Sequence, residues 1–303
     1  MNSRSLNDIK AEAFALGFYA CGTSKVSAVA KVEADKFRAT LEAGGFADMD
    51  YLSRNIEKRL DPTLLMPGAK SIISVALNYT PEIRIPNGRF QIATYAYGKD
   101  YHDAMKQRLH QLANTLGLKE YRVFCDTAPV LERYWAVMSG IGWIGRNHQL
   151  IVPGAGSRVF LGEIITDEEL EYNTEILISR CGDCKACIES CPTMAIGGQS
   201  AFDASRCLSY QTIENRNDIP MDIADKMGDC FYGCDRCIDA CPWNRTAEPT
   251  KIPEFLPSEA LLNMTNEDWK KLDEDDYRRL FKGSAVKRAK YSRLTRKIKL
   301  LKD

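Results

Sequence analysis

No long apolar run occurs in this chain of 303 residues. No segment approaches the ~20 consecutive apolar residues that a membrane span requires, and the N-terminus lacks the charged and then apolar pattern of a signal peptide. The formal net charge is zero, so attraction to a polyanion requires a local patch of charge. Internal repeats of solenoid length are also missing. These absences favour a cytoplasmic globular protein that does not contact a membrane.

Cysteine, in contrast, is concentrated in one region. Nine of the 11 cysteines lie between Cys181 and Cys241, whereas a secreted disulfide scaffold would spread them over a smaller chain. Zinc ribbons separate their cysteine pairs by about fifteen or more residues. Two crowded runs that each end in Cys-Pro are instead the bacterial ferredoxin pattern for [4Fe–4S] clusters. The sequence therefore predicts two clusters and electron transfer. The runs are Cys181-x-x-Cys184-x-x-Cys187-x-x-x-Cys191-Pro192 and Cys230-x-x-x-Cys234-x-x-Cys237-x-x-x-Cys241-Pro242.

The ferredoxin pattern also predicts how the ligands are divided. Each run gives three cysteines to one cluster and its fourth to the neighbouring cluster. The first cluster then takes Cys181, Cys184, Cys187 and Cys241. The second takes Cys191, Cys234 and Cys237 and needs one more ligand, for which spacing alone offers Cys230.

The order of expected elements indicates an α+β protein. An N-terminal mixed α/β domain spans residues 1–170, a ferredoxin-like domain with two [4Fe–4S] clusters spans 171–248, and a short basic helical tail spans 249–303. The spacing of apolar residues predicts helices over 6–16 and 105–118 and strands over 71–79 and 121–125. Residues 149–152 and 158–166 flank a glycine-rich turn and are expected to form a hairpin.

Acidic and basic residues occupy separate segments of the tail. Residues 267–276 are acidic, whereas 278–302 contain eleven Lys or Arg and no acid. A solvated amphipathic helix is one interpretation, and contact with phosphates is the other, because blocks of like charge usually exist for a partner.

A bare two-cluster ferredoxin does not need so large an N-terminal domain, and that domain contains several distinctive stretches. Together with both cysteine runs and the Cys241-Pro-Trp-Asn244 segment, these stretches resemble epoxyqueuosine reductases over nearly the whole chain. Longer family members continue into HEAT-type helical repeats, and this chain is expected to be a short form without them. The stretches are Arg59-Leu-Asp-Pro62, Tyr97-Gly-Lys-Asp-Tyr-His102, Asp126-Thr-Ala-Pro129, Gly140-Ile-Gly-Trp-Ile-Gly-Arg-Asn147 and Phe160-Leu-Gly-Glu163.

The resemblance implies an oxidoreductase of tRNA processing that reduces epoxyqueuosine to queuosine at the wobble position. It implies cobalamin beside the two clusters, which suits the chemistry, because clusters deliver single electrons and the reaction needs two. The usual signature of a histidine that ligates cobalt, Asp-x-His-x-x-Gly, is absent, and the chain has only three histidines. Cobalamin is therefore expected to bind base-off, without a protein imidazole.

The resemblance also implies roles for single residues. Asp126 is expected to bind near cobalamin and to donate a proton to the epoxide. Donation requires a pKa raised by an apolar site, with cobalamin supplying the desolvation; capping a turn is the alternative. Arg59 is expected at the corrin, with a salt bridge to Asp61 or Glu57 as the alternative. Arg133 is expected to contact substrate. The remaining expected corrin contacts are Ala93, Leu150, Leu161 and Ser209.

For the missing cluster ligand, the resemblance favours Cys207 in the segment Arg206-Cys-Leu-Ser209, which leaves Cys230 as a free buried thiol. Cys21 and Cys125 are interpreted as core residues. His102 is either a structural hydrogen-bonding residue or part of the site, and Asp100 and Tyr101 beside it are given no role.

The resemblance also implies binding partners. Basic tail residues including Lys287 and Arg288 are expected to bind the tRNA anticodon stem-loop, with the target base turned outward. An external low-potential electron donor and a monomeric state are expected as well. The alternatives are a two-cluster electron-transfer protein and another corrinoid-dependent reductase.

Overall fold

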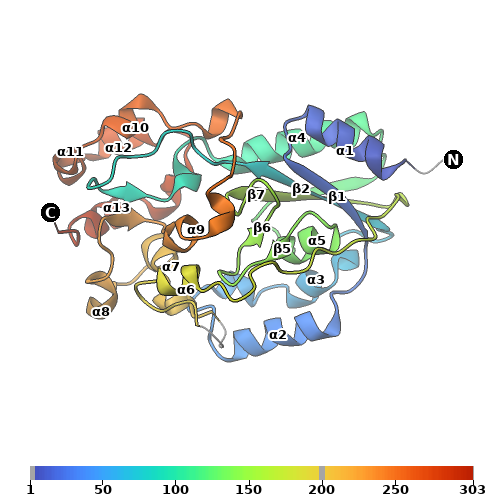
Figure 1. The fold of residues 1–303 in the computed structure, drawn as a ribbon, viewed down its shortest axis with the longest axis horizontal. Helices are drawn as coiled ribbons and strands as arrows, with labels where there is room; N and C mark the ends of the chain where they lie inside the picture. Colours follow the sequence, from blue (N-terminus) through green and yellow to red (C-terminus); the bar gives the residue numbers. More distant parts are fainter. Residues whose placement is uncertain (1–3, 198–201, 303) are drawn as a thin grey trace.

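A four-stranded antiparallel sheet forms the centre of the N-terminal part (Figure 1). The computed structural model describes residues 4–197 and 202–302, so the outer ends of the predicted first and last domains lie outside the described residues. The strand order is β1-β2-β7-β4. Two predicted strands are confirmed, and every residue of β2 is buried. The strands are β1 (Ala20–Lys25), β2 (Ser71–Asn78), β4 (Tyr121–Phe124) and β7 (Val159–Thr166).

Helices cover both faces of this sheet. Alternate side chains of a strand point to opposite faces, so Ile73 and Val75 pack with α1 (Leu6–Ala15) and α4 (Tyr101–Thr115) in one core cluster. Ile72 faces the other way, toward α5 (Glu132–Met138). Further helices on this second side are α2 (Lys31–Glu42) and α3 (Ile56–Leu60) (Figure 1).

Helix ends follow recognisable signals. The predicted N-terminal helix is confirmed as α1, and Gly17 follows it with φ +87°. Helix α4 begins at Tyr101, four residues before the predicted start. The reason is that Asp100 caps it, its side chain accepting a hydrogen bond from the backbone N–H of His102.

The predicted hairpin of residues 149–152 and 158–166 is wrong. Strand β6 (Leu150–Ile151) pairs with β5 (Trp143–Ile144), whereas β7 enters the main sheet between β2 and β4. Only a Val152–Gly156 bridge closes the turn between them. The apolar residues of β7 bury more surface in the central sheet than in a two-stranded hairpin, and burial decides the pairing.

The cysteine-rich part consists of short helices and one short strand. Strand β8 pairs in parallel with β3 (Gln91–Ile92) of the N-terminal part, so contacts cross the predicted boundary at residue 170. The elements are α6 (Ala186–Glu189), α7 (Leu208–Ile213), α8 (Met221–Ala224), β8 (Cys230–Tyr232) and α9 (Arg236–Asp239).

Short 3₁₀-helices complete the description. Within the described residues they are η1 (Asp50–Leu52), η2 (Pro62–Leu64), η3 (Thr94–Ala96), η4 (Ala204–Arg206), η5 (Pro242–Asn244), η6 (Pro253–Phe255) and η7 (Ala285–Ala289).

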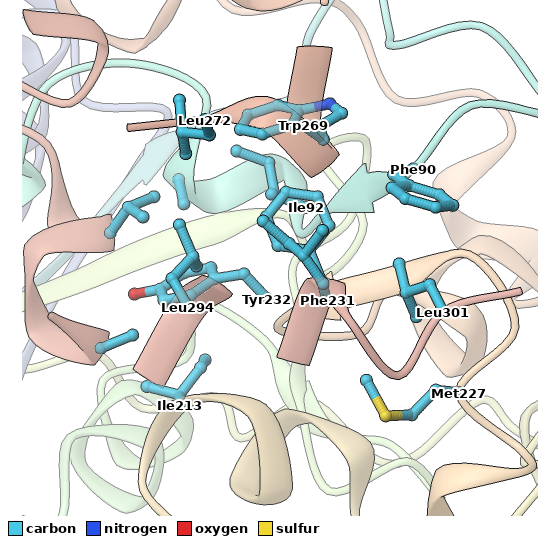
Figure 2. Packing of buried hydrophobic residues seen from close by; sticks show 14 of the residues in the cluster. Phe90, Ile92, Ile213, Met227, Phe231, Tyr232, Trp269, Leu272, Leu294 and Leu301 are labelled. Carbon is cyan, nitrogen blue, oxygen red and sulfur yellow. The ribbon is translucent and has the colours of Figure 1, made fainter. Parts of the chain in front are cut away.

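The tail packs onto the rest of the protein. Figure 2 shows Trp269 and Leu294 of the tail gathered with Ile92 of β3 and Phe231 of β8 in one apolar cluster. Lys297 is also buried, and its Nζ donates a hydrogen bond to the carbonyl of Thr212 at the end of α7. The tail is therefore part of the folded structure. Its helices are α10 (Glu259–Asn263), α11 (Asn266–Lys271), α12 (Glu274–Leu280) and α13 (Tyr291–Ile298).

The predicted α+β class is confirmed: a mixed α/β part, a cysteine-rich part and a helical tail follow one another along the chain. None of the helices in the described residues has the length and apolar character needed to span a membrane.

Candidate active site

Four cysteines of the first predicted set line one cavity of about 280 Å³. Three come from the first run and one, Cys241, from the second, as the ferredoxin ligand swap predicts. Trp143 and Trp243 meet edge to face at 4.9 Å beside Cys241 and close one side. Four thiols around a single enclosed space form a donor set that fits a [4Fe–4S] cluster. They are Cys181, Cys184, Cys187 and Cys241.

The second predicted set gathers around Cys237. Burial first, and then the charges of Cys234, Cys207 and Cys191, raise the pKa of Cys237, which places these four thiols within electrostatic reach of one another. Cys230 also contacts Cys234, but it is buried in β8 and its Sγ donates to the carbonyl of Gly233 at 3.1 Å. This arrangement favours Cys207 over Cys230 as the fourth member.

Asp126 lies at the end of β4, where the chain turns with φ +57°. Its Oδ2 accepts a hydrogen bond from the Tyr101 hydroxyl at 2.9 Å and lies 3.3 Å from Nε2 of His102. The side chain is 58% exposed, so a ligand can reach the carboxylate. Tyr101 stacks between the rings of His102 and Phe160, at 4.2 Å from each.

His102 connects two carboxylates. Its Nδ1 lies 2.6 Å from Oδ1 of Asp100, and its Nε2 faces Asp126. Because both ring nitrogens face acceptors, hydrogen bonds to Asp100 and then Asp126 raise the pKa of His102 to about 9. The imidazolium in turn lowers the pKa of Asp126, and Tyr101 contributes in the same direction. The pKa of Asp126 is thus lowered in this arrangement, whereas the expected rise depends on the desolvation that bound cobalamin would supply.

Arg59, an expected corrin contact, is buried in α3 at 7% exposure. The predicted alternative of a salt bridge is wrong, because Glu57 pairs with Arg38 and Asp61 caps η2. One guanidinium nitrogen of Arg59 donates to the carbonyl of Tyr51 at 3.3 Å. Its Nε has no hydrogen-bond partner among residues 4–197 and 202–302. A buried donor without a partner fits a polar group of a bound cofactor.

The other expected corrin contacts come from separate elements. Leu150 and Leu161 pack in one cluster on the α5 side of the sheet, and Ser209 lies in the first turn of α7. Ala93 lies next to Gly233, which directly follows β8. A Cβ added to Gly233 would lie 2.4 Å from the Cβ of Ala93. Gly233, with φ +71°, therefore lets the loop that carries Cys234 approach the N-terminal part.

Tyr79 connects the Asp126 side of the site with the second cysteine set. After burial, the charges of Asp235 and Cys237 are among those that raise its pKa. The charge of Tyr79 also acts on the pKa of Arg133, together with the charges of Glu132 and Asp126. Arg133 is exposed on α5, so a substrate can contact it near Asp126.

The tail reaches the same region. Arg288 in η7 donates from Nε and Nη2 to the Glu214 carboxylate at 2.7 and 2.8 Å. Its charge also acts on Asp126 and Tyr51. Lys287 beside it is exposed. Of the two predicted tail contacts, Arg288 thus already has a carboxylate partner, while Lys287 faces solvent.

Sequence reasoning missed four residues of this region. Tyr101 and Glu163 stood in distinctive stretches without a role, and Glu132 begins the helix that follows the Asp126 turn. Glu214 gave no sequence signal, because only the packing of the tail on α7 brings Arg288 to it. Glu132 accepts a hydrogen bond from the backbone N–H of Asp126.

Comparison with known proteins agrees with this geometry. Residues 59–127 match the family described as epoxyqueuosine reductase QueG, DUF1730, and residues 180–244 match a 4Fe-4S double cluster binding domain. An epoxyqueuosine reductase from Cellulophaga algicola is 43% identical over 97% of both chains. One from Cyclobacterium marinum is 39% identical over 97% of this chain and 96% of the relative.

The chain belongs to the epoxyqueuosine reductase family. It is thus an oxidoreductase of queuosine biosynthesis with an iron–sulfur domain. A plain electron carrier would not share a matching N-terminal half, so that alternative is set aside.

Solved structures of this family have the same fold. An epoxyqueuosine reductase crystallised with a tRNA-Tyr epoxyqueuosine-modified stem loop superimposes with a TM-score of 0.89 at 26% identity, over 97% of this chain and 80% of that one. The Streptococcus thermophilus reductase gives 0.87 at 28% identity over the same shares. A Bacillus subtilis structure, at 0.88 and 25% over the same shares, has its aspartate catalytic loop swung out of the active site.

Proposed function

We propose that this enzyme reduces epoxyqueuosine to queuosine at the wobble position of tRNA, with Asp126 as the proton donor. The observation that carries the proposal is an accessible Asp126 carboxylate held by Tyr101 and His102. Tyr101 stacks on Phe160, and Phe160 packs against Tyr79, whose pKa is raised in part by Cys237 of the second cysteine set. Converting the epoxide to an alkene and water consumes two electrons and two protons. The site has to provide both.

In this proposal, electrons enter through two [4Fe–4S] clusters, supplied by an external low-potential donor. Thiolates hold such clusters, and crossing the ligands between the runs binds both clusters into one unit. The first set is Cys181, Cys184, Cys187 and Cys241, and the second is Cys191, Cys207, Cys234 and Cys237.

Cobalamin, when bound, would supply the two-electron chemistry that single-electron clusters lack. Arg59 would hold a polar substituent of the corrin through its buried Nε. Leu150 and Leu161 would exclude water from it, with Ala93 and Ser209 at the side of the clusters. His102, whose ring nitrogens both face carboxylates, is not free to ligate cobalt.

Protons come from the His102–Asp126 pair. His102 holds a proton at Nε2 toward Oδ2 of Asp126, and Asp126 passes it to the epoxide oxygen. Asp100 keeps the imidazole oriented through Nδ1. A general acid with a charged neighbour of raised pKa is reloaded without waiting for bulk solvent.

The tRNA anticodon stem-loop is the proposed partner. Lys287 would contact a phosphate. Arg288 would either leave Glu214 to contact a phosphate or keep its pairing with Glu214 and stabilise the site. Arg133 would contact the modified nucleotide, which has to be turned outward to reach Asp126.

The proposal is tested by anaerobic reconstitution of the full chain with cobalamin, a low-potential reductant and tRNA from cells blocked at the epoxide stage. The mass of the released nucleoside reports turnover. Asp126→Asn should keep its iron and its corrin absorbance but lose most of the activity. Single-turnover rates like those of the wild type would remove Asp126 from the chemistry.

A further inference from the structure

Glu163 is an ionisable residue inside the central sheet. It is 0% exposed on β7, where it lies directly opposite Phe124 of β4 and Ser74 of β2. Neither carboxylate oxygen has a hydrogen-bond partner in the part of the chain that the structure describes. An ionised carboxylate in such a place would lose its hydration without compensation. Glu163 therefore keeps its proton, in agreement with a pKa raised well above the usual range by burial.

Glu132 is the acidic neighbour of Glu163. Their charges interact, and Glu132 is the first residue of α5, on the face of the sheet toward which Glu163 points. One oxygen of Glu132 accepts a hydrogen bond from the backbone N–H of Asp126. Burial, followed by the charge of Asp126, raises the pKa of Glu132 to about 8.

The hydrogen bond matters because of the conformation of Asp126. Its φ of +57° is in the left-handed region, which residues other than glycine rarely adopt and which costs free energy. Such a residue persists only where its surroundings fix it. Cys125 and Thr127 on either side are joined by a backbone hydrogen bond of 2.6 Å, and the Glu132 oxygen fixes the amide between them.

We propose that Glu132 positions the Asp126 turn for proton donation, with Glu163 as a neutral buried neighbour. Glu132 holds the Asp126 amide. Glu163, opposite Phe124 on the strand that leads into the turn, stays neutral and so adds no second negative charge there. Both are positioning residues, because they act on substrate only through Asp126. The inference rests on the proposed function and deepens it by naming the residues that hold the donor in place.

The contact requires an oxygen acceptor of the right reach, not a charge. Glutamine keeps both the length and the acceptor, leucine keeps the approximate size without an acceptor, and aspartate keeps the carboxyl group but is one methylene shorter. Comparing Glu132→Gln, Glu132→Leu and Glu132→Asp therefore distinguishes the effect of the hydrogen-bond acceptor from the effects of the carboxyl group and of packing. Glu163→Gln is the matched replacement for the neutral partner.

The experiment measures amide hydrogen exchange of the peptide that contains Asp126 in the full-length protein with its clusters. The same variants are assayed for kcat and KM on epoxyqueuosine tRNA. Glu132→Leu should exchange at least tenfold faster at the Asp126 turn, with kcat reduced about tenfold and KM for tRNA unchanged. Glu132→Gln and Glu163→Gln should stay within about twofold of the wild type in both measurements.

Iron content and circular dichroism establish that each variant is folded. Should Glu132→Leu fail to fold, Glu132→Asp decides: faster exchange and lower kcat support the proposal. A Glu132→Asp variant that matches the wild type while Glu132→Gln is impaired would show that charge matters and would overturn it. An active Asp126→Asn enzyme would remove Asp126 as the proton donor of the proposed function, whereas the exchange results would still report on the turn.

Discussion

The raised pKa of His102 leads to a quantitative prediction. Its pKa is raised from 6.5 to about 9 by Asp100 and Asp126, a shift of about 2.5 units that corresponds to about 3.4 kcal/mol of preference for the charged form. The His102 side chain is 22% exposed, but those of Asp100 and Asp126 are 38% and 58% exposed, so solvent screening reduces this free energy. Asp100 is the larger cause. Asp126→Asn should therefore lower the pKa of His102 by about one unit, or about 1.4 kcal/mol, and Asp100→Asn should lower it further.

The assay is an NMR titration of histidine Cε1–H signals in the full-length protein. The chain has only three histidines, so His102→Gln assigns the signal, and the signals of His110 and His148 serve as internal controls. Because the pKa of folded His102 is raised, the pair stabilises the fold fully below pH 6.5 and this contribution disappears as the pH passes about 9. A His102 titration at its ordinary value, or one insensitive to Asp126→Asn, would refute the paired arrangement.

Two further predictions concern the clusters and the tail. Cys207→Ala should lose roughly half of the iron, because one of two clusters loses a ligand. Cys230→Ala should keep its iron, since Cys230 donates to the Gly233 carbonyl. Iron analysis showing the reverse would exchange the two assignments. Lys287→Gln combined with Lys290→Gln should weaken tRNA binding and flatten its salt dependence, by about 0.7 to 0.9 in slope for each phosphate that the protein no longer neutralises. Lys31→Gln on α2, whose side chain is 88% exposed, is the matched control, and an equal slope in both proteins would return the tail to a purely structural role.

Burial changes the interpretation of the basic tail. Lys297 lies inside the protein at 1% exposure, and desolvation lowers its pKa to about 8. Arg296 pairs with Asp218 at 2.9 Å and Lys302 with Asp225 at 3.1 Å. Part of the positive charge therefore attaches the tail to the cluster-bearing part. A smaller set of exposed lysines remains for the proposed contact with RNA.

Local patterns were sufficient for several features. The cysteine runs predicted the ligand swap that gathers Cys181 and Cys241 around one cavity, because the spacing of the ligands is a property of the chain itself. Apolar periodicity found β2 and α1 for the same reason. The hairpin prediction failed where two possible partners competed for β7, since periodicity contains no information about which strand is available.

The sequence by itself determined the family, the gathering of the first cysteine set around one cavity and the order of the parts, because each depends on residue types at short spacing. Only the tertiary structure brought His102 of α4 to Asp126 after β4, Arg288 to Glu214, and Glu163 opposite Phe124. These contacts join elements far apart in the chain, and their protonation depends on burial, which only the packed fold creates.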